Sequence, residues 1–254
     1  MPTKIEWCEE SWNPVIGCRK VSAGCTNCYA ERMAVRLAAM GHERYRKVIT
    51  DGRWNGEACF VESELEKPYR WKKPRLIFVG SMGDTFLTDK APYNLLFKTV
   101  WQNPRHRIII LTKRPKRMQD VMRWWMKDNN DRLPNLWLGV SVENLDTLME
   151  RVPRLKGTAA AKRVVNYEPA LEGLSEQEWY TGLLAGQCID WVICGCESGP
   201  KARPFNEDWA RTARDACQEC DIPFFYKQGP PYMRRGQPTK MPTLDGRVWA
   251  QRPN

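Results

Sequence analysis

From residue 76 onward, short apolar runs alternate with segments that repeat apolar residues at the spacing of a helix. The apolar runs do not alternate polar with apolar positions, which is typical of strands covered on both faces. Strands that alternate with helices form parallel βα units through right-handed crossovers. The predicted strands are residues 76–79, 107–111, 136–140, 163–165, 191–194 and 223–226, and the predicted helices are residues 93–101, 115–127, 145–155, 177–184 and 207–219.

The first part of the chain adds one strand and one helix to this series. Residues 13–16 form a short apolar run, and residues 29–40 carry an apolar stripe at helical spacing, Met33, Leu37 and Met40. With these additions the pattern gives about seven βα units. It therefore predicts an α/β fold, a partial or open (β/α) barrel of about six to seven parallel strands.

The same pattern indicates one domain over residues 1–254. Residues 41–75 are polar and broken by glycine and proline, so we expect a connecting insertion there. Residues 229–254 are rich in proline, glycine and arginine and predict an irregular C-terminal strap.

Functional groups follow nearly every predicted strand. In β/α barrels the active site lies at the carboxyl ends of the strands, so these positions are candidates for binding and catalysis. They are Ser81, Met82, Gly83 and Asp84 after strand 76–79, Lys113 after strand 107–111, Ser141 and Glu143 after strand 136–140, Glu168 after strand 163–165 and Glu197 after strand 191–194.

Two of these carboxylates are candidates for catalysis, together with Lys113. Glu168 follows a buried strand, where an unpaired carboxylate is costly, so we expect Lys113 or Lys227 to pair with it. Glu197 lies between two glycines that allow a ligand to approach the backbone closely.

The clearest chemistry lies in a glycine- and serine-containing loop that carries Cys18, Cys25 and Cys28. Six residues separate the first two thiols and two residues separate the last two, so a mobile loop can bring all three to one inorganic centre. A structural zinc site usually takes four protein ligands. A cubane cluster on three thiolates leaves one iron with an open position. The loop therefore favours a three-cysteine [4Fe–4S] cluster.

Other interpretations of the cysteines stay open at this point. Zinc would need a fourth ligand, which Cys8 or His42 would supply from nearby sequence. Any one cysteine also suits a purely structural, buried position. A second metal site would use four cysteines near the C-terminus, Cys194, Cys196, Cys217 and Cys220.

The composition narrows the class of partner and compartment. The 254-residue chain has a formal net charge of +10, which favours polyanionic partners such as nucleic acid or an acidic protein. Two histidines argue against a histidine-based site, and ten irregularly spaced cysteines do not resemble a secreted disulfide framework. We expect a cytoplasmic protein without a membrane segment, because neither a signal peptide nor eighteen consecutive apolar residues occur in the sequence.

A series of motifs spans nearly the whole chain: WNPVIGC, the GC-x6-C-x2-CYAE loop, RWKKPRLIFVGSMGDTF, ILTKRPKRM, LWLGVSVEN, the EP at residues 168–169, GCESGPKARP and PFFYKQ. The series resembles a phage- and prophage-associated family of unknown function that is placed among the radical S-adenosylmethionine (radical SAM) proteins. Three features differ from the expected pattern: the six-residue spacing where three residues are usual, Asn27 before the third cysteine, and Cys196 in place of a glycine.

The resemblance implies a [4Fe–4S] cluster on Cys18, Cys25 and Cys28, with SAM as the second cofactor. SAM would be cleaved to a 5′-deoxyadenosyl radical that abstracts hydrogen, after reduction by a flavodoxin- or ferredoxin-like protein. A phage-encoded member would work in the host cytoplasm. The implied SAM contacts are Ser81, Met82, Gly83 and Asp84 toward the amino group, Lys113, Ser141 and Glu143 toward the carboxylate or ribose, and Tyr29 toward the adenine.

The step from Cys28 to Tyr29 and the strand-end pair Thr112 and Lys113 also resemble the DNA-repair lyases that reverse spore photoproducts. Together with the positive charge, this favours DNA, RNA or a nucleotide as the substrate. The alternative function is a non-catalytic nucleic-acid-binding protein that zinc or a cluster stabilises. In that protein, the basic aromatic segment 66–75 would contact phosphates.

Overall fold

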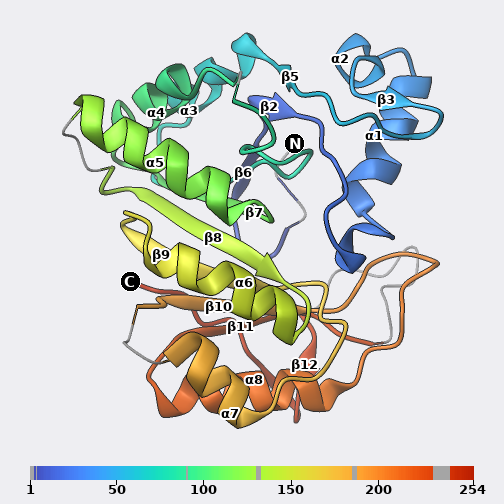
Figure 1. Ribbon diagram of the computed structural model, residues 1–254, viewed down its shortest axis with the longest axis vertical. Helices are drawn as coiled ribbons and strands as arrows, with labels where there is room; N and C mark the ends of the chain where they lie inside the picture. The colour runs from blue at the N-terminus through green and yellow to red at the C-terminus, as the bar shows by residue number, and fades with distance from the viewer. Residues whose placement is uncertain (1–2, 4, 90, 130–132, 185–187, 231–240) are drawn as a thin grey trace.

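The computed structural model describes residues 3, 5–89, 91–129, 133–184, 188–230 and 241–254. Its centre is a seven-stranded, all-parallel sheet whose strand order follows the order of the chain (Figure 1). The sheet is curled into a half-barrel, so the predicted open barrel of six to seven parallel strands is confirmed. Its strands, in order, are β1 (Glu10–Trp12), β6 (Leu76–Val79), β7 (Arg107–Thr112), β8 (Leu136–Val142), β9 (Lys162–Tyr167), β10 (Trp191–Gly195) and β11 (Phe224–Gln228).

One face of the sheet is covered by the helices that connect the strands. Ile77 and Ile110 of the sheet pack there with Phe97 of α4 in one large apolar core. Helices cover one face of the sheet and a second apolar core covers the other face. The strands are therefore unbroken apolar runs in the sequence. The helices are α4 (Tyr93–Trp101), α5 (Pro115–Asn129), α6 (Leu145–Lys156), α7 (Glu176–Trp179), which continues into the π-helix η3 (Tyr180–Leu184), and α8 (Glu207–Glu219).

The inner face of the half-barrel is filled by aromatic side chains. The ring of Trp191 lies edge-on to Trp7 and Trp137, with centroid distances of 5.9 and 6.2 Å, and contacts Phe225 in the same manner. Edge-to-face packing at these distances is favourable beyond the area that it buries. The inner face is thus a packed core, and the polar chemistry gathers at the carboxyl ends of the strands.

The first strand of the sheet is not the one predicted from residues 13–16. Residues 10–12 form β1 and pair with β6, whereas β2 (Val15–Ile16) pairs antiparallel with β5 (Cys59–Phe60) outside the main sheet. Pro14 separates the two strands because it has no N–H to donate to a ladder. The search for apolar runs in the sequence did not find β1, because only one of its three residues, Trp12, is apolar and buried.

The six strands predicted from residue 76 onward are confirmed, but several extend further at their carboxyl ends. β8 extends to Val142, so Ser141 lies within the strand rather than after it. The polar residues Ser141 and Asn166 are partners in the β8–β9 register, and the Asn166 amide donates to the Ser141 hydroxyl at 3.2 Å. This paired position gives Ser141 a structural bond that the apolar pattern did not reveal.

Helix α1 (Tyr29–Ala39) is present, but it does not bury the predicted methionine stripe. Met33 and Met40 are 44% and 63% exposed, and Leu37 is only partly buried. The helix instead buries Ala30 and Ala34, whose small side chains let it approach its neighbours closely.

The insertion at 41–75 contains short regular elements; Figure 1 shows α2 (Glu43–Arg46) and β3 (Ile49–Thr50) beside α1, and α3 (Lys67–Arg70) beside α4. The C-terminal strap holds a hairpin within its described part and joins the sheet through a bridge between Phe225 and Ala250.

No helix in the described ranges is both long and apolar enough to span a membrane. The remaining elements are η1 (Ala23–Cys25), α2 (Glu43–Arg46), β3 (Ile49–Thr50), β4 (Arg53–Trp54), η2 (Glu62–Glu66), α3 (Lys67–Arg70), β12 (Thr243–Leu244) and β13 (Arg247–Val248).

Candidate functional site

The cysteine loop begins by docking onto the loop that follows β6. Gly17 forms a bridge with Gly83, and its N–H donates to the Met82 carbonyl at 3.2 Å. The Gly17 carbonyl in turn accepts from the Asp84 N–H at 3.1 Å. Gly17 has a φ of +104°, a conformation that favours glycine. The predicted strand-end segment from Ser81 to Asp84 therefore lies directly against the start of the loop.

A buried carboxylate then holds the middle of the loop. Glu143, which is 1% exposed, follows β8 and accepts from the Ser22 hydroxyl at 2.5 Å and from the Gly24 N–H at 2.6 Å. The Lys113 ammonium lies 2.5 Å from the same carboxylate, and Arg151 lies 3.4 Å from it. Glu143 thus anchors the loop to the sheet through groups far apart in sequence.

The close approach of the loop to Glu143 requires a glycine at position 24. A β-carbon on Gly24 would lie 2.5 Å from Cδ of Glu143 and 2.8 Å from Nζ of Lys113. Neither neighbour is free to retreat, because the two are paired with each other and Glu143 is buried. The residue before Cys25 is therefore fixed as glycine by packing.

Two cations lie beside the thiols of the loop. The Lys113 ammonium is 3.8 Å from Sγ of Cys25, and the Arg114 guanidinium is 4.0 Å from Sγ of Cys18. Burial raises the pKa of the Cys25 thiol, but the Lys113 charge and hydrogen bonds near Ser22 outweigh burial and hold that pKa below its usual value. Burial and the nearby Asp84 charge raise the pKa of Cys18 to about 12, against the effect of Arg114.

Asp84 holds one of these two cations, Arg114, in place. Its carboxylate accepts from the Thr112 hydroxyl at 2.8 Å and pairs with Arg114 at 2.7 Å. Arg114 also donates to the Arg19 carbonyl in the cysteine loop at 2.6 Å. The side chain of Asp84 is therefore committed to holding Arg114 beside Cys18.

The other end of the loop is held by the segment after β10. Glu197, which is 5% exposed, pairs with Arg203 and accepts from the Asn27 amide at 3.0 Å. Arg203 also donates to the Ala23 carbonyl at 2.9 Å. Burial opposes ionisation of Glu197, but the bonds from Arg203 and Asn27 outweigh it and lower the pKa of its carboxyl to about 2.

The remaining strand-end residues line the same edge. Glu168 pairs with Lys227 rather than with Lys113, which confirms one of the two predicted partners. The Tyr29 hydroxyl donates to the Ser81 carbonyl at 2.8 Å while its side chain is 43% exposed. Burial of the hydroxyl, together with the Glu168 and Cys28 charges, raises the pKa of Tyr29.

The described residues contain no group of three or more His, Cys, Asp or Glu side chains that is arranged to hold a metal ion. Cys18, Cys25 and Cys28 are therefore not gathered into such a group here, with or without Cys8 or His42, and neither are the four cysteines near the C-terminus. No disulfide joins the ten cysteines, all of which lie in the described residues. The chemistry of the three loop thiols is nevertheless that of a thiolate-bound centre. All three lie on one anchored loop, and a cation lies beside Cys25 and another beside Cys18.

The sequence analysis assigned no role to four groups that hold the loop or its anchor, Asn27, Arg114, Arg151 and Arg203, although Arg114 follows a predicted strand directly after Lys113. Arg114 and Arg203 lie within the quoted motifs, so their presence in ILTKRPKRM and GCESGPKARP was a usable signal. Arg151 lies within α6 and carries no such signal. Asn27 was noted only as a departure from the expected pattern, whereas it is a partner of Glu197.

The fold and the site together define an α/β protein with an open, parallel half-barrel and a three-thiol loop anchored across its carboxyl edge. A family model described as "Protein of unknown function (DUF5131)" matches residues 2–253, and the chain belongs to that family. Neither a curated protein nor a solved structure matches the chain.

Replacing Glu143 tests its role as the anchor. Glu143→Ala leaves the buried Arg151 and the partly buried Lys113 without their carboxylate, so we expect a loss of about 3–5 kcal/mol in the free energy of unfolding. Urea denaturation of the full chain measures it. The control Glu150→Ala removes an exposed carboxylate that pairs with the same Arg151 and should cost less than about 1 kcal/mol. Equal, small losses in both variants would contradict the anchoring role.

Glu197 makes stability dependent on pH in a defined window. Its folded pKa of about 2 lies below the ordinary value of 4.5, so its contribution is present above pH 4.5 and is lost as the pH falls toward 2. Between pH 6 and pH 3 we expect wild type to lose about 1–2 kcal/mol more of its unfolding free energy than Glu197→Gln. Urea midpoints at the two pH values measure this difference. Identical pH profiles of the two proteins would overturn the assignment.

Proposed function

We propose that this protein is a radical SAM enzyme that holds a [4Fe–4S] cluster on Cys18, Cys25 and Cys28. The observation that carries the proposal is the three-thiol loop, which the buried Glu143 anchors across the carboxyl edge of a parallel half-barrel. Active sites of β/α barrels lie at this edge. Such a cluster, when bound, supplies reductive cleavage of SAM, and the proposed substrate that loses hydrogen is a nucleic acid or a nucleotide.

The residues around the loop have defined tasks in this proposal. Lys113 favours the thiolate of Cys25, because its ammonium lies 3.8 Å from the sulfur. Arg114 places a second positive charge beside Cys18. Glu143 neutralises Lys113 and fixes the loop, so it acts as a positioning residue rather than as the SAM contact that the resemblance implies.

Binding of SAM would use the surface beside the loop. Tyr29 is 43% exposed as a residue while its hydroxyl is held by Ser81, and it is the proposed neighbour of the adenine. The backbone from Ser81 to Gly83 lies at the same edge, where Tyr29, Gly17 and Asn13 hold its position through hydrogen bonds. Ser141 lies in β8 two residues before Glu143 and is the proposed neighbour of the ribose.

The proposed catalytic carboxylates are held in ion pairs that open toward the same edge. Glu168 pairs with Lys227 and Glu197 pairs with Arg203, so a cation orients each carboxylate. In this arrangement they would orient a substrate and stabilise charge on it. The net charge of +10 also suits docking of an acidic, flavodoxin- or ferredoxin-like reductant.

A second candidate is a non-catalytic nucleic-acid-binding protein that zinc or a cluster stabilises. The net charge of +10 suits a protein that only binds nucleic acid as well as it suits an enzyme that acts on nucleic acid. The zinc form of this candidate differs from the enzyme in its metal, since an iron–sulfur protein is brown when purified without oxygen and a zinc protein is colourless. A cluster form would differ in that it does not cleave SAM.

Removing one thiol tests the cluster. After anaerobic reconstitution, wild type should be brown and carry iron and acid-labile sulfide, whereas Cys25→Ala should lose most of both. Cys59→Ala removes a free thiol outside the loop and should keep the full content. Iron and sulfide analysis of the three proteins, with zinc measured in parallel, gives the comparison. Colourless wild type with bound zinc, or undiminished iron in Cys25→Ala, would refute the proposed site.

A further inference from the structure

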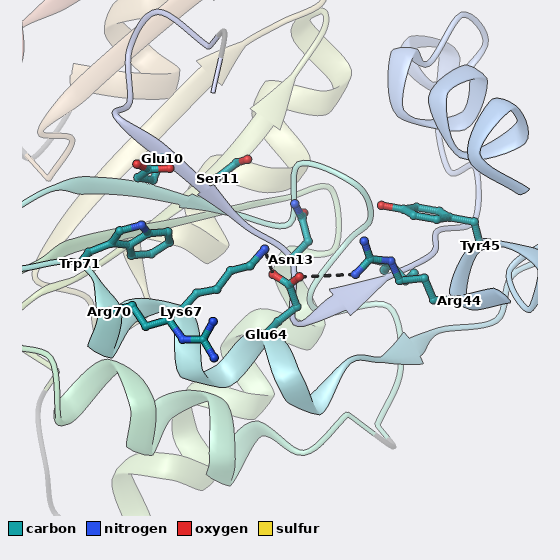
Figure 2. Close-up of a pocket in the computed structure, with 10 residues that line it drawn as sticks. Glu10, Ser11, Asn13, Arg44, Tyr45, Glu64, Lys67, Arg70 and Trp71 are labelled. Atoms are coloured by element: carbon teal, nitrogen blue, oxygen red, sulfur yellow. Dashed lines mark hydrogen bonds and ion pairs between the residues drawn. The ribbon is translucent and has the colours of Figure 1, made fainter. Parts of the chain in front are cut away.

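A polar cavity of about 320 Å³ lies at the free edge of the sheet, away from the cysteine loop. It is enclosed between β1, which has a sheet neighbour only on its β6 side, and the insertion that carries α2, η2 and α3 (Figure 2). Its volume is at the lower end of the range of about 300–1,000 Å³ that is typical of small-molecule sites. Nothing in the proposed chemistry at the cysteine loop uses this cavity.

The carboxylates of the cavity are already neutralised. Figure 2 shows Arg44 and Lys67 reaching the buried Glu64 from opposite sides, at 3.4 and 2.7 Å. Arg75 pairs with the second carboxylate, Glu10, at 3.1 Å. Arg44 and Lys67 are 42% and 45% exposed, so both retain N–H donors that face solvent. Arg70 is also in the wall; it pairs with Glu66, but its side chain is 71% exposed, so the exposed donors of three cations favour an anion in the cavity.

Aromatic side chains lie beside these cations. Trp71 and Tyr45 contribute to the wall, and the Arg44 guanidinium lies 5.4 Å above the Tyr45 ring. The cavity therefore combines donors for a phosphate with a flat surface on which a base can stack. Lys72 and Lys73, both exposed, continue the positive charge beyond Trp71.

The cavity is joined to the carboxyl edge through one side chain. Asn13 lines the cavity, and its amide donates to the Ser81 hydroxyl at 3.0 Å and accepts from the Met82 N–H at 2.9 Å. The Ser81 carbonyl is the acceptor of the Tyr29 hydroxyl. The cavity and the strand-end segment that contacts Tyr29 are therefore neighbours.

We propose that this cavity is a nucleotide subsite that binds one phosphate and one base of a single-stranded nucleic acid. Arg44, Lys67 and Arg70 contact the phosphate, and Trp71 stacks on the base. The inference deepens the proposed function by locating a subsite for a single-stranded nucleic acid, and it rests on that function for the statement that the bound strand is the substrate.

Fluorescence anisotropy with fluorescein-labelled single-stranded DNA and RNA oligonucleotides at low salt tests the subsite. We expect the double variant Arg44→Ala/Arg70→Ala to bind about tenfold more weakly than wild type. The matched control Lys116→Ala/Arg123→Ala removes the same charge from exposed positions on α5 and should change affinity less than about twofold. Equal losses in the two double variants, or no binding by wild type, would overturn the subsite.

The stacking residue gives an independent check that leaves the charge unchanged. Trp71→Leu should lose about tenfold in affinity, and Trp71→Phe should recover most of it, because the phenyl ring still stacks. Thermal unfolding of both variants shows whether they keep the fold, and no difference in affinity between them would refute stacking at Trp71. All of these binding measurements use protein without cluster or SAM, so their failure is distinguishable from failure of the proposed chemistry.

Discussion

The structure depends on a buried carboxylate that lies between a sheet and a loop. Glu143 is 1% exposed and has four donors, the Ser22 hydroxyl, the Gly24 N–H, and the Lys113 and Arg151 side chains. A buried carboxylate is unfavourable without such partners, so the folded state forms only when the loop and the strand ends come together. This coupling places the three cysteines at the carboxyl edge, and the Glu197–Arg203 pair holds the far end of the same loop.

The open barrel explains why there is room for two sites. A closed barrel would place another strand beside β1, whereas here that edge faces the insertion. The inner face of the half-barrel is packed with aromatic rings, which leave no room for a ligand inside it. A ligand must therefore bind at the carboxyl ends of the strands or beside β1. The loop and the cavity occupy those two places, and Asn13 at the end of β1 connects them.

The sequence predicted most of the sheet because strands covered on both faces are continuous apolar runs, such as 107–111. It failed at β1, where only Trp12 is apolar and where Pro14 separates the strand from the apolar run after it. It also failed on the buried face of α1, since alanines rather than methionines make the close contact. The Glu168–Lys227 pair was predictable because the parallel topology brings strand ends together. The anchoring role of Glu143 was not, because its partners Ser22 and Gly24 lie more than a hundred residues away in a loop without periodicity.

The central claim is that the anchored loop holds an iron–sulfur cluster with an open position for SAM. EPR spectroscopy of anaerobically reconstituted, dithionite-reduced protein, with and without SAM, tests it most directly when 5′-deoxyadenosine is assayed in the same sample. The proposal predicts a reduced-cluster signal that SAM changes, together with formation of deoxyadenosine. Absence of a cluster signal, with zinc found by elemental analysis, would contradict it and leave the strand-end residues as groups for binding alone.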